Sequence, residues 1–494
     1  MNMNLLERAA NALKQQNYTS AHEAYHKVVS DPANYSVTQV GKAHYGLGYI
    51  AQLHQDWPNA IEAFQLACQL LPETPSPLLG LANAFNAVLS DIDALTTLEY
   101  AHRRFPNDDN VTYALLQQTI TMGKNKKSVS LIKPLLSSQQ DELFALALLD
   151  TTKLDKQLIQ DQHIQRAEAL IQHYQTHHHT QFDTLAALLY ALGELSYHLN
   201  NFAKAQEYWQ QANECQRTQC RFNTQDMAPY FQSLLHISRI EEVTHALDPI
   251  SFTPVFIVSL PRTGSSLLAH KLVQHGGNEI ANAGEVNYLS ETVNWLCQQT
   301  QHPYPDCLSH LTPALINNAR RRYAQLIATH RLNTRLIIDK LPANFQSLPI
   351  IVQLFPEAHI IHLTRSYANT ALSIMRNSFA ANEPYFCNED ELFIYMDHYH
   401  QIMSHYTAIY PEKILSVHYE ELVQDLPAQL ADIYVALGIT RGKQIDISQS
   451  PMNDSSIRTL SAIQARLPVY QSSITLDTYW QVHFERFNDI GQST

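Results

Sequence analysis

The first half of the sequence repeats itself with a period of 34 residues, which becomes visible when Ala60 is aligned with Ala94. Small residues at such positions let two helices approach closely, and a proline after each unit ends its second helix. The period therefore predicts a stack of helical hairpins, each packed mainly on its neighbours. The recurring positions are Leu47, Gly48, Ala60, Phe64, Ala67 and Pro72, followed by Leu81, Ala82, Ala94, Leu98, Ala101 and Pro106.

Further units extend this pattern in both directions. An earlier unit fits through Ala21, Tyr25 and Pro32, the units between about 110 and 180 are degenerate, and a later unit has "NNFAKA" as its turn. The later unit is carried by Leu192, Gly193, Ala205, Trp209 and Ala212. The repeats resemble tetratricopeptide repeats, and the resemblance implies an all-α solenoid over residues 1–235. Such a solenoid offers a concave groove to a protein or peptide segment, or serves only as a packing or dimerisation scaffold.

The sequence changes character after residue 235. Short β-branched runs alternate with helical patterns: "PVFIVSL", "RLIIDK", "AHIIHLTR" and "KILSVHYEEL". Continuous apolar strands separated by helices are typical of a parallel sheet covered on both faces. We therefore expect a second domain of the α/β class over residues 250–494, with ligands bound beyond the carboxyl ends of its strands.

Composition excludes several classes of protein. The chain has 494 residues, which predicts two or more domains, and its net charge of −13 argues against a general nucleic-acid or membrane-surface binder. The six cysteines are scattered without a CxxC pair, so neither a zinc site nor a disulfide framework is expected. Glu7 and Arg8 interrupt any apolar signal segment, and "HHH" at 177–179 lacks further ligands nearby. These features predict a soluble, cytoplasmic protein without a metal.

The stretch "FIVSLPRTGSSLLAHKL" at 256–272 predicts a strand, a loop and a helix. That order places backbone N–H groups and two hydroxyls at a helix N-terminus, where an anion is favoured. The loop is not a nucleotide-binding P-loop of the G-x-x-x-x-G-K-[ST] type, because Gly264 precedes Ser265 and the cation, Arg262, stands at the front of the loop. No lysine is placed to bridge β and γ phosphates.

The loop "PRTGSSLL" resembles the 5′-phosphosulfate loop of sulfotransferases that use 3′-phosphoadenosine 5′-phosphosulfate (PAPS). It is particularly similar to the loop of tyrosylprotein sulfotransferases and of bacterial sulfotransferases fused to tetratricopeptide repeats. The resemblance implies a P-loop-like sulfotransferase domain, and both threonines of the usual loop are serines here. It also implies that the cofactor's 5′-phosphosulfate is held by Arg262, Thr263, Gly264, Ser265 and Ser266.

Four other stretches carry the same resemblance, which covers about residues 250–480. In "FPEAHIIHLTRSYANTALSIMR", Arg365 and Ser373 have the eight-residue spacing of the family's 3′-phosphate site, and Arg376 sits one place from a further phosphate-contacting Arg. An arginine can fork two donors onto a phosphate. The remaining stretches are "DKLPANF", which implies Lys340 at the reaction centre, "VHYEELV", which implies Tyr419 beside the nucleotide, and "RTLSAIQARLPVYQSS", which implies a covering loop. In that loop Leu467 replaces a lysine, and Arg466 is the expected substitute.

Sulfuryl transfer to a hydroxyl needs charge stabilised on the bridging oxygen and a base for the acceptor proton. Arg262 and Lys340 are expected to supply the charge. Glu285 in "NAGEVNYL" stands where the tyrosylprotein enzymes carry their carboxylate, although Val286 replaces their second glutamate. Glu285 is therefore the expected base. His275, in the helix that follows the loop with Arg262, is the alternative, and we expect it to be a packed or surface histidine instead.

These residues predict a PAPS-dependent sulfotransferase that transfers sulfate to a hydroxyl, with a protein tyrosine as the favoured acceptor. The repeat groove is expected to hold a protein or peptide acceptor, and a homodimer is left open. Two other functions remain. A nucleotide phosphotransferase is disfavoured by the missing lysine and by the lack of a "DxxG"-type element for Mg²⁺, and a repeat scaffold with an inactive sulfotransferase-like domain is disfavoured by the intact Arg262, Lys340, Arg365 and Ser373.

Overall fold

The computed structural model describes residues 5–177, 181–219, 224–240, 247–379, 383–439, 463, 466 and 475–491. Contacts between residues divide the chain into two compact units, Met1–Ser138 and Gln139–Thr494. The all-helical part extends through both units, over about the first 230 residues, and the strands begin at Thr253. The division into domains at 1–235 and 250–494 stays a prediction.

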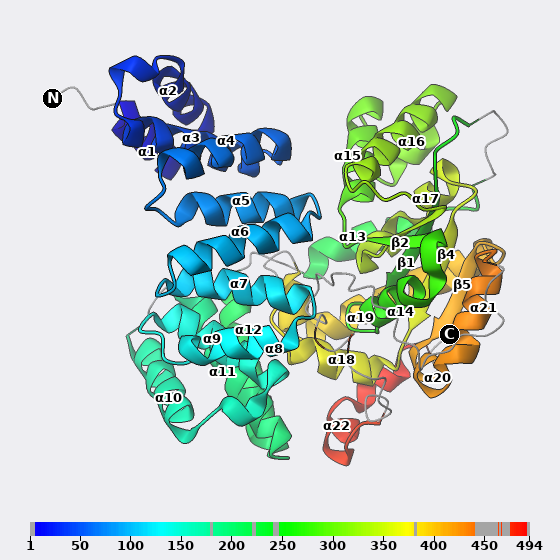
Figure 1. The fold of residues 1–494 in the computed structure, drawn as a ribbon. Coiled ribbons are helices and arrows are strands. Elements are labelled where there is room, and N and C mark those ends of the chain that lie inside the picture. Colours follow the sequence, from blue (N-terminus) through cyan, green and yellow to red (C-terminus); the bar gives the residue numbers. More distant parts are fainter. Residues whose placement is uncertain are drawn as a thin grey trace. The chain divides into compact units, whose positions relative to one another are not determined.

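The first unit consists of helices packed as neighbours along the chain (Figure 1). They are α1 (Leu5–Lys14), α2 (Tyr18–Ser30), α3 (Val37–Leu53), α4 (Trp57–Leu70), α5 (Ser76–Ala87), α6 (Asp91–Arg104), α7 (Asp109–Thr121) and α8 (Asn125–Leu135). The aligned Ala60 and Ala94 are both fully buried. A Cβ at Gly48 or Gly80 would come within 2.8 Å of the Phe64 ring, so these glycines allow the close helix contacts.

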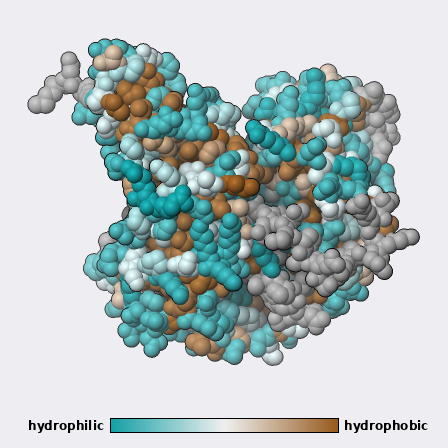
Figure 2. Space-filling view, viewed as in Figure 1, coloured by the Kyte–Doolittle hydropathy of each residue, from teal (hydrophilic) through white to brown (hydrophobic). Residues whose placement is uncertain are grey.

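The 34-residue period is visible in the turns between these helices. Gln55, Leu89 and Gly123 follow α3, α5 and α7 at intervals of 34 residues, and each has a left-handed backbone with φ of 58°, 56° and 71°. Asn200 has the same conformation between α11 (Phe182–His198) and α12 (Phe202–Thr218), where "NNFAKA" predicted a turn. Periodic helical hairpins are therefore present, and their assignment to the tetratricopeptide family stays a prediction. Figure 2 shows apolar side chains on the visible face of α1 and α2.

The second unit begins with helices and continues into the sheet. Its helices before the sheet are α9 (Asp141–Leu154), α10 (Asp161–Thr176), α11 (Phe182–His198), α12 (Phe202–Thr218) and α13 (Thr224–Leu235). The strands are β1 (Thr253–Ser259), β2 (Ile280–Gly284), β3 (Leu336–Asp339), β4 (His359–Thr364) and β5 (Ile414–His418). The helices after β1 are α14 (Ser265–Gly276), α15 (Tyr288–Thr300), α16 (Pro313–Ala328), α17 (Leu348–Leu354), α18 (Tyr367–Met375), α19 (Glu389–Ile409), α20 (Tyr419–Gln424), α21 (Leu426–Ala436) and α22 (Thr478–His483).

All strand pairs of the five-stranded sheet are parallel, in the order β2-β3-β1-β4-β5. The central strand β1 is buried on both faces, as its continuous apolar run predicts. On one face Val255 and Ile257 join a core with residues of α14 and α21, and on the other Phe256 packs on Tyr323 and Phe355. The parallel sheet and its two covered faces are thus confirmed. β2 was not among the predicted strands.

Two further properties concern the described residues as a whole. None of their helices has the length and apolar character needed to cross a bilayer. Five of the six cysteines lie among them, and these five carry free thiols.

Candidate functional site

The five strands end at one edge of the sheet, and a predicted site residue follows each of them. The loop with Arg262 comes after β1, and Glu285 directly follows β2. Lys340, Arg365 and Tyr419 directly follow β3, β4 and β5. Parallel strands present their carboxyl ends together, so residues from positions 262 to 419 meet at this edge (Figure 1).

The loop after β1 is tightly folded. Arg262 and Gly264 have positive φ values of 67° and 102°, and the Thr263 hydroxyl donates to the Leu260 carbonyl at 2.9 Å. A Cβ at Gly264 would overlap the Tyr419 ring, which explains why glycine is needed here. Gly264 also begins α14 without a side-chain cap, so the positive end of the helix dipole faces the loop.

Four predicted cofactor residues form one cluster beside this loop. The Arg262 Nε donates to the Ser373 Oγ at 3.2 Å, and the Arg365 Nη1 donates to the Arg262 carbonyl at 2.9 Å. The Arg365 guanidinium lies over the Tyr419 ring, 4.7 Å from its centre. Both arginines thus belong to one set of contacts around the loop, although Ser373 lies 111 residues after Arg262 in the chain.

Lys340 and Glu285 form the second cluster of the site. The Lys340 Nζ donates to the Ser266 Oγ at 3.2 Å and forms an ion pair with the Glu285 carboxylate. Lys340 is 1% exposed, whereas the Glu285 side chain is 35% exposed. Burial lowers the pKa of Lys340, and the carboxylates of Glu285 and Asp339 act in the opposite direction. The predicted cation therefore contacts both the predicted base and Ser266 at the start of α14.

Asp339 supports this cluster and was missed in the sequence, although it lies within the quoted "DKLPANF". Its carboxylate is fully buried and accepts hydrogen bonds from the Tyr323 hydroxyl at 2.9 Å and the Asn344 amide at 3.0 Å. Burial raises the pKa of Asp339 to about 7, against the effect of these donors and of Lys340. The hydrogen bonds fix the chain where β3 ends and Lys340 begins.

Glu383 was also missed and lies near Glu285. Burial raises the pKa of Glu383 to about 7, and the negative charge of Glu285 adds to this effect. The two residues are far apart in sequence and share no motif, so no local pattern could have paired them.

Other predicted residues lie outside these clusters. His275 is in the last turn of α14, and burial lowers its pKa. Arg376 binds Glu194 of α11 with both Nε and Nη2, at 2.7 and 2.6 Å, instead of reaching the loop. Arg466 is described, and its backbone N–H donates to the Ile463 carbonyl at 3.3 Å. The rest of the predicted covering loop at 458–473, including Leu467, lies outside the described residues.

The side chains at this edge suit a ligand with several negative charges. Arg262, Arg365 and Lys340 are cations, and Ser265 and Ser266 begin α14 with two hydroxyls. Glu285 is the carboxylate that contacts Lys340. Such a donor set fits the phosphate and sulfate groups of PAPS. Among the described residues, no three His, Cys, Asp or Glu side chains come together as a metal site.

Comparison with known proteins agrees with this geometry. Residues 254–442 match the Sulfotransferase family. An uncharacterized protein of Aquifex aeolicus (strain VF5) is 22% identical over 403 residues, or 78% of this chain and 50% of that protein. The chain thus spans about half the length of this curated relative. The family match covers less than half of the chain, and sulfotransferases of this family generally use PAPS as the donor for sulfuryl transfer.

Two solved structures are also similar, each over about half of the chain. The sulfotransferase domain from the curacin biosynthetic pathway is 15% identical, with a TM-score of 0.30, over 49% of this chain and 97% of that chain. A sulfotransferase from Alicyclobacillus acidocaldarius is 13% identical, with a TM-score of 0.28, over 49% and 92%.

The raised pKa of Asp339 predicts a specific dependence of stability on pH. Below the pKa of the unfolded chain, the carboxyl is protonated in both the folded and the unfolded state. As pH rises from there, the unfolded state releases its proton first, so the free energy of unfolding falls until pH passes the folded pKa of about 7. Relative to Asp339→Asn, which stays neutral, the wild type should lose up to roughly 4 kcal/mol of unfolding free energy between pH 4 and 8. Urea unfolding of both proteins across this range measures the difference. Parallel pH curves would show that Asp339 titrates normally in the folded chain.

Proposed function

We propose that this chain is a PAPS-dependent sulfotransferase whose acceptor is a protein hydroxyl, most specifically that of a tyrosine. The observation that carries the proposal is the meeting of Arg262, Glu285, Lys340 and Arg365 at the carboxyl ends of four strands, within the part that matches the Sulfotransferase family. The assignments of these side chains to individual roles follow from their positions and from the family resemblance.

In the proposed reaction, the S–O bond to the donor phosphate breaks while a new S–O bond to the acceptor oxygen forms. Glu285 takes the acceptor's proton, because its exposed carboxylate lies beside Lys340 and can reach solvent or substrate. Lys340 and the amides of the loop neutralise charge on the phosphate oxygen that leaves. Arg365 and Ser373 hold the 3′-phosphate, and Tyr419 packs beside the nucleotide.

A protein acceptor is supported by the helical part of the chain. The unit Met1–Ser138 contains an open groove between α2, α3 and α4. Its lining mixes apolar side chains with polar ones that can bind a peptide backbone, including His22, His26, His44, Leu47, Ile50, Asp56 and Glu62. An enzyme for small phenols would need no such surface. We propose that this groove, in a tetratricopeptide-like array, binds a segment of the acceptor and raises its concentration near Glu285.

Other parts of the proposal rest on the sequence alone. A cytoplasmic location, a homodimer and a repeat domain ending near residue 235 are predictions of this kind. The alternative of a nucleotide phosphotransferase is disfavoured because Gly264 stands directly before Ser265, where a P-loop has its lysine. The alternative of an inactive scaffold is disfavoured because Lys340 still contacts both Glu285 and Ser266.

The 3′-phosphate site predicts selective binding of adenosine 3′,5′-bisphosphate over AMP. At a concentration one hundred times its Kd, the bisphosphate should stabilise the protein by about 2.7 kcal/mol. Arg365→Ala should abolish the preference over AMP, because the guanidinium that forks onto the 3′-phosphate is gone. Thermal shift and calorimetry measure both. Arg335→Ala, at the opposite end of β3, is the matched control and should keep the preference. A stronger preference for ATP with Mg²⁺ would contradict the proposal.

The role of Glu285 predicts a loss of rate without a loss of cofactor binding. Glu285→Gln keeps the size of the side chain but removes the base, so transfer should slow by about 100-fold or more. Affinity for adenosine 3′,5′-bisphosphate should change little. Glu383→Gln provides the comparison, since it removes the neighbouring carboxylate. A larger rate loss in Glu383→Gln than in Glu285→Gln would assign the base to Glu383.

The class of acceptor is testable with labelled PAPS. The full chain is added to a cell lysate with PAPS carrying ³⁵S, with Glu285→Gln as the control for background. We expect label in proteins, and sulfotyrosine among their hydrolysis products. Label confined to small molecules would refute the protein acceptor while leaving the sulfotransferase assignment intact.

A further inference from the structure

The C-terminal end of α18 is held by the helices that precede the sheet. Arg376, directly after α18, forms two hydrogen bonds with the carboxylate of Glu194 on α11. Its guanidinium lies 4.1 Å from the centre of the Tyr197 ring and 5.2 Å from that of Trp209. Glu194 is 7% exposed, so this ion pair is sheltered from water. A sheltered, two-pronged arginine–carboxylate pair fixes direction as well as distance.

A second contact holds the same helix end. The Asn213 amide on α12 donates to the Met375 carbonyl at 2.7 Å, and Asn213 itself accepts from the Tyr190 hydroxyl at 2.7 Å. Met375 is the last residue of α18, so its carbonyl has no partner within the helix. α12 thus supplies the polar cap that this helix end requires.

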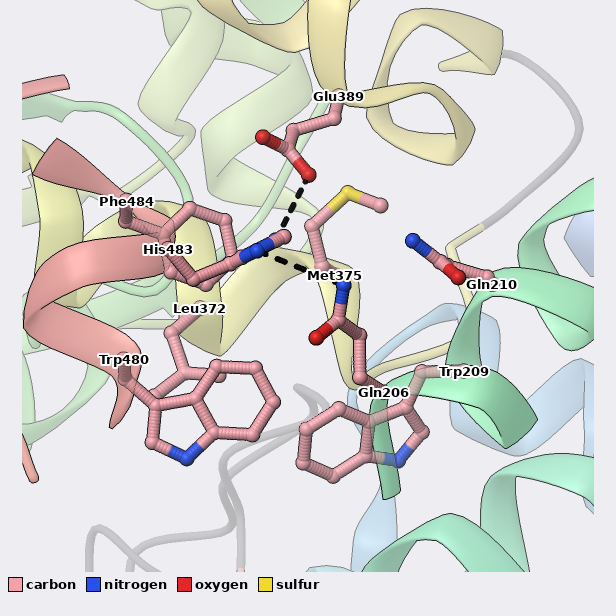
Figure 3. A pocket seen from close by; sticks show the side chains of 9 residues that line it. All are labelled: Gln206, Trp209, Gln210, Leu372, Met375, Glu389, Trp480, His483 and Phe484. Carbon is pink, nitrogen blue, oxygen red and sulfur yellow. Dashed lines mark hydrogen bonds and ion pairs between the residues drawn. The ribbon is translucent and has the colours of Figure 1, made fainter. Parts of the chain in front are cut away.

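Apolar packing completes the attachment (Figure 3). Trp209 of α12 and Trp480 of α22 lie with ring centres 5.6 Å apart and line a small pocket together with Leu372 and Met375 of α18. These side chains leave α18 little room to rotate or slide.

The attachment matters because α18 carries a predicted cofactor residue. Ser373 lies one turn before Arg376, and its hydroxyl accepts from Arg262 of the loop at 3.2 Å. Arg365, at the other end of this segment, donates to the Arg262 carbonyl. A shift of α18 would therefore move Ser373 away from Arg262 and separate the groups that face the phosphates.

Charged residues of the helices before the sheet also lie near Arg262. Lys153 on α9 is buried, which lowers its pKa, and the groups acting on it include Asp150, Arg262 and Glu194. The helices before the sheet therefore place their own charges close to the cofactor loop.

We propose that Glu194 is a positioning residue of the cofactor site, acting through Arg376 to hold Ser373 where it and Arg262 can bind the cofactor's phosphates. This rests on the proposed function, because the ligand is the 3′-phosphorylated nucleotide. It makes the helices of residues 139–219 part of the cofactor site rather than an attached arm. Glu194 itself touches neither cofactor nor acceptor.

The test compares Glu194→Gln with Glu391→Gln in the full chain. The Arg217–Glu391 pair is the matched control, because it too joins a helix before the sheet to the sheet-containing part with two hydrogen bonds, at 3.0 and 2.8 Å. It connects α12 to α19, whereas the Glu194–Arg376 pair connects α11 to the end of α18. Calorimetry gives the Kd of adenosine 3′,5′-bisphosphate and of AMP for each protein, and thermal unfolding gives Tm. We expect both variants to lower Tm, and only Glu194→Gln to reduce the bisphosphate-to-AMP affinity ratio, by about tenfold or more.

Arg376→Lys provides a milder variant in case Glu194→Gln does not fold. It keeps the positive charge but loses the two-pronged geometry, so the affinity ratio should fall by a smaller factor. The inference is overturned if these variants fold and keep the wild-type ratio of bisphosphate to AMP affinity. It is also overturned if Glu391→Gln lowers that ratio by the same factor as Glu194→Gln. A wild-type protein that does not prefer the bisphosphate would instead refute the proposed function, and this inference with it.

Discussion

The register of five parallel strands determines where chemistry can occur in this chain. Gly284 pairs with Asp339, Ser259 with Leu363 and Thr364 with His418. β2 and β3 therefore end together, β1, β4 and β5 end close together, and all five release their next residues at one edge. A slip of one residue in β3 would exchange the directions of Asp339 and Lys340, because successive side chains point to opposite faces. The buried hydrogen bonds of Asp339 oppose such a slip. The position of Lys340 thus depends on a neighbour that takes no part in the proposed reaction.

Much of the fold and site could be predicted because the signals are local. The helical hairpins follow from small residues at a fixed period and from turns that adopt a left-handed conformation at Gln55, Leu89 and Gly123. The four predicted strands have continuous apolar runs, whereas β2, "IANAG", has a single β-branched residue and gave no such signal. Apart from Ser373, the predicted residues that meet at this edge follow a strand or begin a helix, which is where sequence motifs place anion-binding groups.

What the sequence did not reveal depends on distant contacts. Glu194 and Arg376 are 182 residues apart, and nothing near Arg376 indicates that its partner lies in a helical hairpin. The division into compact units also depends on distant contacts. The units divide at Ser138 because contacts such as that of Asn213 with Met375 join α12 to the sheet-containing part. Periodicity reports how a segment folds locally, but burial and long-range ion pairs decide which segments form one unit. The pKa of Asp339 likewise follows from burial, which its position beside a lysine does not disclose.

The ion pair between Lys340 and Glu285 places the proposed cation and the proposed base of the reaction in contact. Lys340 also donates to Ser266 at the start of α14, so one buried ammonium group joins the segment after β1 to the carboxylate after β2. A donor bound at the loop would bring negative charge close to Ser266, and this charge and Glu285 would then attract the same ammonium group. The proposed sites for donor and acceptor are therefore coupled through Lys340, so we expect a change at this residue to affect both.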